Sequence, residues 1–206
     1  KIDLYEVINA IRMRPTHNNI RQPGFGVGGY CLTKDPLFAK IAARDILNID
    51  GHDFPFSSEA VKINNNMPLV TLKKIEFYFD NTLAGKHFLL MGITYREDIG
   101  DTRFSPSEIF AYHAKKSGAI ISAHDPLVSK WEEVDDVEFF DKLPDPNKYD
   151  AIIFAVKHKE FSMINFDRWL KNKKVLIFDA NNVLIKTQLE SIKTHGYNYQ
   201  SIGRGG

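Results

Sequence analysis

Our expectation for the fold starts from one run of residues, Lys86-His87-Phe88-Leu89-Leu90-Met91-Gly92. Its apolar run has the length of a short buried strand, and a glycine follows it directly. Similar short apolar runs recur at residues 119–124, 150–156, 174–179 and 197–202. We expect these five runs to be strands of one sheet.

The segments between these runs favour helices. Ser105 is a good N-cap, Pro106 suits the first helical position, and Glu108 completes a capping box, so a helix is predicted over residues 105–117. Further helices are expected over residues 161–171 and 185–195. Apolar strands that alternate with helices are typical of a doubly wound parallel sheet, which is Rossmann-like. The acidic run at residues 132–145 is expected to be a solvated edge.

Before residue 85 the apolar residues have helical spacing instead. They recur every three or four positions in residues 1–12, 32–44 and 57–80. In the last of these, Ser57 or Ser58 could cap the start, and Pro68 would kink or divide the helix. The chain is therefore predicted to be α/β, with a helical segment at residues 1–84 and the sheet at residues 85–206.

Composition excludes several classes of protein. A net charge of +1 over 206 residues gives no sign of a surface for nucleic acid or an anionic membrane. A single cysteine rules out an internal disulfide and fits the reducing cytoplasm. No apolar run reaches the roughly 18 residues of a membrane span, and no signal peptide is evident. Because the sequence starts with Lys1 rather than Met, we expect it to be part of a longer protein.

The sole cysteine follows a glycine-rich run. Residues 23–36 read Pro-Gly-Phe-Gly-Val-Gly-Gly-Tyr-Cys-Leu-Thr-Lys-Asp-Pro. Free N–H groups in such a loop can surround an anion. A helix that begins at Leu32 would place Cys31 at its positive end, which lowers the pKa of a thiol and favours a nucleophile. The alternatives are that the cysteine is a small buried hydrophobe and that the glycines only form a tight turn.

Two segments in the second half could bind a ligand, because ligands of open α/β sheets bind beyond the carboxyl ends of the strands. The loop at residues 92–106 holds Arg96 and Arg103, whose guanidinium groups suit phosphate or carboxylate. Both arginines could equally pair with acidic neighbours in the same loop. After the fourth run, Asn182 could bind a ribose or base, or cap a turn.

Several of these motifs resemble one known family. The run at residues 24–36 resembles the catalytic-cysteine loop of the UDP-glucose/GDP-mannose dehydrogenase family. Gly-Ile-Thr-Tyr-Arg-Glu-Asp and Asp-Thr-Arg-Phe-Ser-Pro, at residues 92–98 and 101–106, resemble the motif that opens the family's UDP-binding domain. His124-Asp125-Pro126 is similar to its Asp-Pro turn, and residues 155–161 resemble enzymes that act on UDP-N-acetylhexosamines. Asn181 departs from the family, which usually has an arginine there.

The resemblance implies an NAD-dependent dehydrogenase that oxidises the C6 alcohol of a UDP-sugar, here a UDP-N-acetylhexosamine, to a uronic acid. It implies that Cys31 forms a thiohemiacetal and then a thioester, that Asp35 orients or activates water, and that Lys34 favours the thiolate or an oxyanion. The implied substrate-binding residues, with the backbone of 25–29 around the pyrophosphate and sugar, are Phe25, Gly26, Val27, Gly28, Gly29, Tyr30, Arg96, Arg103 and Asn182.

The resemblance also implies what this chain lacks. The family's NAD-binding domain carries Gly-x-Gly-x-x-Gly after a strand, and no such unit is in this sequence. We therefore expect this chain to be the C-terminal part of the enzyme and to be inactive alone. It is expected to bind a UDP-sugar and no metal, while NAD binds mainly to the N-terminal domain. It is also expected to form a dimer through its central helices. The alternatives are UDP-glucose or GDP-mannose as substrate, a non-catalytic nucleotide-binding module, or a structural dimerisation fragment.

Overall fold

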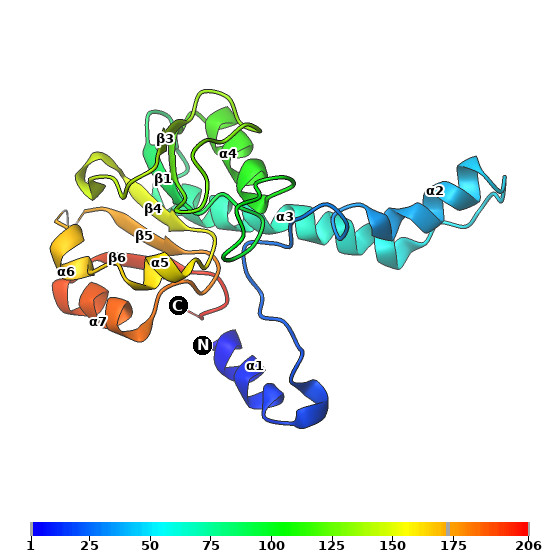
Figure 1. Ribbon diagram of the computed structural model, residues 1–206, viewed down its shortest axis with the longest axis horizontal. Helices are drawn as coiled ribbons and strands as arrows, with labels where there is room; N and C mark the ends of the chain where they lie inside the picture. Colours follow the sequence, from blue (N-terminus) through cyan, green and yellow to red (C-terminus); the bar gives the residue numbers. More distant parts are fainter. Residues whose placement is uncertain (1, 172–173, 206) are drawn as a thin grey trace.

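The structure, a computed structural model, describes residues 2–171 and 174–205. These residues form a six-stranded, all-parallel sheet in the order β3-β2-β1-β4-β5-β6 (Figure 1). The strands are β1 His87–Met91, β2 Ile120–His124, β3 Glu138–Phe140, β4 Ala151–Phe154, β5 Leu176–Asp179 and β6 Asn198–Ser201. The predicted doubly wound parallel sheet is confirmed, and all five predicted strands belong to it.

Strand β3 was not predicted from the sequence. It lies within the acidic run at residues 132–145 and pairs only with β2, so this run does contain one edge of the sheet. Three residues are too few for a clear apolar pattern, and the two phenylalanines of β3 are only partly buried. Its strand geometry therefore comes from pairing with β2.

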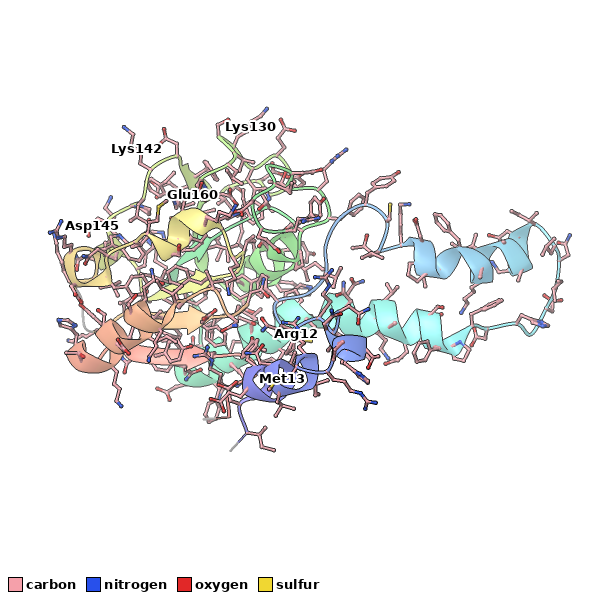
Figure 2. All side chains as sticks on the ribbon, turned by 60° about the horizontal axis from the view of Figure 1, so that its bottom comes forward. Arg12, Met13, Lys130, Lys142, Asp145 and Glu160 are labelled. Carbon is pink, nitrogen blue, oxygen red and sulfur yellow. The ribbon has the colours of Figure 1, made fainter. Side chains whose placement is uncertain are left out.

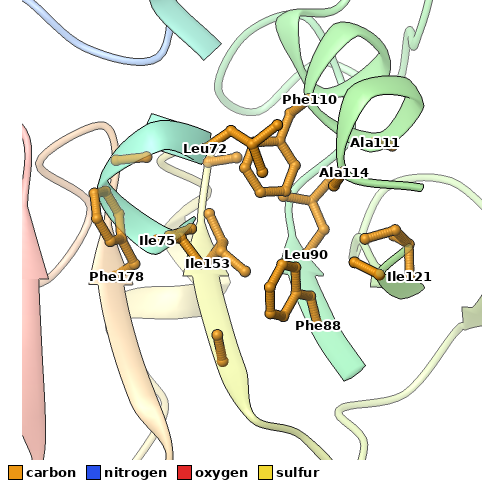
Figure 3. Packing of buried hydrophobic residues seen from close by; sticks show 14 of the residues in the cluster. Leu72, Ile75, Phe88, Leu90, Phe110, Ala111, Ala114, Ile121, Ile153 and Phe178 are labelled. Atoms are coloured by element: carbon orange, nitrogen blue, oxygen red, sulfur yellow. The ribbon is translucent and has the colours of Figure 1, made fainter. Parts of the chain in front are cut away.

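The two faces of the sheet bury alternate side chains of each strand. Phe88 and Leu90 of β1 face one apolar cluster, whereas Leu89 and Met91 face the other. Figure 3 shows the first cluster, where α3 (Pro55–Tyr78) and α4 (Pro106–Lys116) cover the sheet. The second face is covered by α5 (Lys159–Ser162), α6 (Phe166–Trp169) and α7 (Lys186–His195). The single helix predicted over 161–171 is thus two short ones.

Helix α4 starts where its sequence indicates. Ser105 is the N-cap, and its hydroxyl accepts a hydrogen bond from the Ser107 N–H. The same hydroxyl donates to the Thr94 carbonyl, while the N–H of Glu108 donates to the Ser105 carbonyl. The cap therefore differs from the predicted capping box, because Ser105 also has to hold the loop that follows β1.

The long helix α3 begins at Pro55, two residues before the predicted start. Phe54 is its N-cap with φ of 40°. Pro55 lies in the first turn, where a backbone N–H would have no acceptor within the helix, so the N–H that proline lacks is not needed. The N–H of Ser58 donates to the Phe54 carbonyl, so neither Ser57 nor Ser58 caps the helix. Pro68 lies inside α3 without dividing it.

The segment before α3 differs more from its prediction. A helix was expected from Leu32, but residues 31–34 form a turn, and the 3₁₀ helix η2 (Asp35–Leu37) leads into α2 (Phe38–Asp45). The N–H groups of Lys34 and Asp35 both donate to the Cys31 carbonyl. Cys31 is therefore not at a helix N-terminus, because Pro36 favours helix initiation at its own position.

Residues 38–66, with α2 and the first half of α3, form an arm that projects from the sheet (Figures 1 and 2). Leu72 and Ile75, in the second half of α3, belong to the core of the sheet. The short helix α1 (Leu4–Arg12) lies beside the chain end, where Asp3 pairs with Arg204. In the part of the chain that is described, no helix combines the length and apolarity needed to cross a bilayer.

Candidate functional site

A cleft of about 540 Å³ opens beyond the carboxyl ends of β1 and β4. These neighbouring strands continue in opposite directions across the sheet, which makes this edge the topological switch point. The lining comes from the α1 region, the loop before Cys31, the β1–α4 loop and the turns after β4 and β5. Hollows of about 690 Å³ over α4 and about 680 Å³ beside β6 are larger. Neither is lined by the loops at this switch point, so we assign the ligand site to the cleft.

The cleft is rich in positive charge. Among the described residues that line it, Arg12, Arg21, Arg96 and Lys157 are cationic, and Glu97 is anionic. Guanidinium groups bind phosphate oxygens bidentately, so this lining suits a ligand with a diphosphate. The Arg12 Nε donates to the Ile20 carbonyl at 2.6 Å, which holds the α1 side of the cleft in place.

The glycine loop (residues 23–31) lies against the start of α4. An added Cβ on Gly28 would come within 2.7 Å of the Phe104 carbonyl oxygen, so this close approach requires a glycine. The N–H of Gly29 donates to the same carbonyl, and the N–H of Val27 donates to Oδ1 of Asn64 on α3. Of the amides predicted to surround an anion, Val27 and Gly29 therefore already have acceptors within the protein.

The β1–α4 loop that carries Arg96 is held by a buried polar cluster. Oδ2 of Asp125 accepts hydrogen bonds from the N–H groups of Ile93 and Thr94 and from Nε2 of His158. Burial by itself would raise the pKa of Asp125, but the hydrogen bonds from His158 and the backbone outweigh it, and the pKa is lowered. From the sequence, Asp125 and His158 were noted only as parts of motifs that resemble the family. Their positions after β2 and β4, the two strands that flank β1, were the signal for this cluster.

The three predicted catalytic residues lie together in the structure. Cys31 is exposed, and its neighbour Leu32 lines the cleft. Lys34 Nζ donates to Asp35 Oδ1 at 2.7 Å, and this bond raises the pKa of the lysine. The same Nζ lies 4.2 Å from the centre of the Tyr30 ring. Lys34 and Asp35 thus pair with each other, and Cys31, Lys34 and Asp35 are themselves outside the described lining of the cleft.

Not every predicted binding residue reaches the cleft. Phe25, Gly26, Val27, Gly28 and Arg96 line it, whereas Gly29, Tyr30, Arg103 and Asn182 are outside the described lining.

Arg103 forms a bidentate ion pair with Asp101. Asn182 Oδ1 accepts a hydrogen bond from the Arg204 guanidinium group. Asn181 lines the cleft instead, and its Nδ2 donates to the Ala155 carbonyl. It packs against Gly24, where an added Cβ would meet Asn181 Oδ1 at 1.8 Å.

The chain is similar to nucleotide-sugar dehydrogenases over its whole length. It is 26% identical to the UDP-N-acetyl-D-mannosamine dehydrogenase of Pyrococcus horikoshii, over 99% of this chain and 45% of that protein. It is 27% identical to the UDP-glucose 6-dehydrogenase of Rickettsia bellii, over 87% of this chain and 41% of that protein. The chain thus spans less than half the length of these relatives.

Solved structures show the same likeness. The NDP-N-acetyl-D-galactosaminuronic acid dehydrogenase of Methanosarcina mazei superposes with a TM-score of 0.83 at 26% identity, over 100% of this chain and 45% of that one. The UDP-D-ManNAc dehydrogenase of Pyrococcus horikoshii gives 0.72 at 25% identity, over 99% of this chain and 45% of that one.

Two family models match consecutive parts of the chain. Residues 1–66 match the central domain of the UDP-glucose/GDP-mannose dehydrogenase family, and residues 89–186 match its UDP-binding domain. The resemblance seen in the glycine loop and in the β1–α4 loop therefore extends over most of the sequence. This chain belongs to the UDP-glucose/GDP-mannose dehydrogenase family.

Proposed function

We propose that this chain is the UDP-sugar-binding part of an enzyme that oxidises the C6 alcohol of a UDP-N-acetylhexosamine to a uronic acid. The observation that carries the proposal is the cationic cleft at the switch point, within the segment that matches a UDP-binding domain. The N-acetylhexosamine is inferred from the mannosamine and galactosaminuronic acid enzymes among the relatives.

Cys31 is proposed as the nucleophile. Its thiolate would add to the carbonyl carbon of the C6 aldehyde, and the carbonyl oxygen would take up a proton to give a thiohemiacetal. Oxidation of this adduct gives a thioester, which water hydrolyses to the acid and the free thiol. Asp35, which forms an ion pair with Lys34, is proposed to orient the water.

The oxidant of this family is NAD, and the described residues do not fit it. The turn after β1 reads Gly92-Ile-Thr-Tyr-Arg and lacks the later glycines that let a backbone approach a pyrophosphate closely in dinucleotide-binding turns. We therefore propose that NAD binds to a domain outside this chain, and we assign no oxidation step to residues of this chain.

A homodimer is proposed through α3. Phe56, Ile63, Val70 and Phe77 recur every seven residues, which is close to two helical turns, so they share one face. All four are exposed, Phe56 by 89% and Phe77 by 77%. An apolar stripe of this length on a surface helix is typical of a helix–helix interface. The proposed partner is a second copy of this chain.

The test uses the complete enzyme and the single variant Cys31→Ser. We expect UDP binding to remain and uronate formation to be lost for every sugar in a panel of UDP-N-acetylmannosamine, UDP-N-acetylglucosamine, UDP-glucose and GDP-mannose. Normal turnover by this variant would remove Cys31 from the mechanism. The chain alone should bind UDP in calorimetry, and tight binding of NAD to it would contradict the division of ligands between domains.

A further inference from the structure

Asn64, on the arm, makes two hydrogen bonds to a single residue of the glycine loop. Its Oδ1 accepts from the N–H of Val27 at 2.7 Å, and its Nδ2 donates to the carbonyl of Val27 at 2.7 Å. The two residues are 37 positions apart in the chain. The side-chain amide thus occupies both polar groups of one residue's backbone, as a neighbouring β-strand does.

This contact matters because the loop has few side chains with which to anchor itself. Phe25 is buried in the core, but Gly26, Gly28 and Gly29 have no side chain, and Val27 is 52% exposed. Just before the start of α4, the Phe104 carbonyl accepts a hydrogen bond from the N–H of Gly29. Further along, the Thr33 hydroxyl donates to the Gly29 carbonyl. Asn64 therefore holds the loop on its α3 side, directly at residues that line the cleft.

We propose that Asn64 is a positioning residue for ligand binding in the cleft. It fixes both peptide groups of Val27 toward α3, and so sets the orientation of the Gly26 and Gly28 backbone that lines the cleft. Without it, a glycine-rich segment would have to be ordered by the ligand itself, which lowers affinity. The effect on affinity rests on the proposed UDP site, but the fixing of the loop does not.

The adjacent residue offers a matched control. Asn65 is exposed on the same helix, so Asn64→Ala and Asn65→Ala make the same change in composition and in helix propensity. We expect Asn64→Ala to bind UDP about tenfold more weakly than Asn65→Ala in calorimetry, which is the loss expected for two hydrogen bonds. Asn64→Gln, which keeps the amide on a longer stem, should recover part of the affinity.

A second measurement tests the geometry without a ligand. Amide exchange followed by NMR should be about tenfold faster at Val27 in Asn64→Ala, because the amide loses its acceptor. The rates in α3 and in the sheet should not change. This readout separates the local hydrogen bonds from a general loss of stability.

The outcomes are distinct. Affinity of Asn64→Ala within twofold of Asn65→Ala, or unchanged exchange at Val27, would overturn the role of Asn64. If the parent chain itself does not bind UDP, the proposed function fails, and the exchange rate at Val27 then decides alone whether Asn64 fixes the loop.

Discussion

Nε2 of His158 lies 3.0 Å from Oδ2 of Asp125, and the side chains of both residues are completely buried. The two residues follow β4 and β2, the strands on either side of β1. Nδ1 of His158 accepts from the N–H of Asp98, so Nε2 carries the proton. The loop after β1 is therefore fastened from both neighbouring strands, and this places Arg96 in the cleft.

Asp125→Asn should destabilise the fold by about 2–3 kcal/mol at neutral pH in urea unfolding, because an amide nitrogen replaces an acceptor of backbone N–H groups. The folded state lowers the pKa of Asp125, so its stabilising effect is present above the unfolded value of about 4 and is lost as the pH falls below it. The stability gap between parent and variant should therefore narrow below about pH 4. The exposed Asp141→Asn should show no such gap, and a constant gap down to pH 2 would contradict the linkage.

Arg96 and Arg103 lie on the same loop but have different surroundings. Arg96 lines the cleft, whereas Arg103 is paired with Asp101 and is not among the described lining residues. We expect Arg96→Met to weaken UDP binding at least about tenfold, the loss of a charge-assisted hydrogen bond to phosphate, and Arg103→Met to change it less than twofold. Calorimetry at one fixed salt concentration measures both. Equal losses for the two variants would show that general surface charge, not the cleft, binds the nucleotide.

Gly28→Ala should disturb the cleft only through steric overlap of the added methyl group. The new methyl group would meet the Phe104 carbonyl oxygen at 2.7 Å and Pro106 at 2.8 Å, so the loop or the start of α4 has to move. We expect a cost of about 1–3 kcal/mol in unfolding free energy and a loss of UDP affinity. Gly51→Ala, which has nothing within 4 Å of its new methyl group, should leave UDP affinity unchanged. Tight UDP binding by Gly28→Ala would mean that the loop does not shape the ligand site.

Ile63→Glu should dissociate the proposed dimer, because it places a charge in the middle of the apolar stripe on α3. Sedimentation velocity is expected to show a dimer for the parent chain and a monomer for the variant. Asn65→Glu, on another face of the same helix, adds the same charge and should stay dimeric. A monomeric parent chain would contradict the proposed dimer through α3.

Local sequence patterns are enough to predict the parallel sheet. Its apolar strands bury alternate residues on two faces, as Phe88 and Leu89 do, and this alternation is written into the local order of residues. The start of α4 was equally local, since Ser105 and Pro106 specify a helix N-terminus wherever they stand together. The glycine loop and Arg96 were also found, because their motifs are continuous in the chain.

The pairing of polar groups from distant parts of the chain could not be predicted in this way. Asn64 reaches Val27 across 37 residues, and His158 reaches Asp125 across 33, so no local pattern announces either pair. In the folded chain Arg103 pairs with Asp101, whereas Arg96 lines the cleft. Similarly, β3 is a strand because it pairs with β2. The burial of apolar side chains follows a short repeat along the chain, which can be seen in the sequence. A hydrogen bond instead needs two atoms about 3 Å apart, and only the folded chain brings these atoms together.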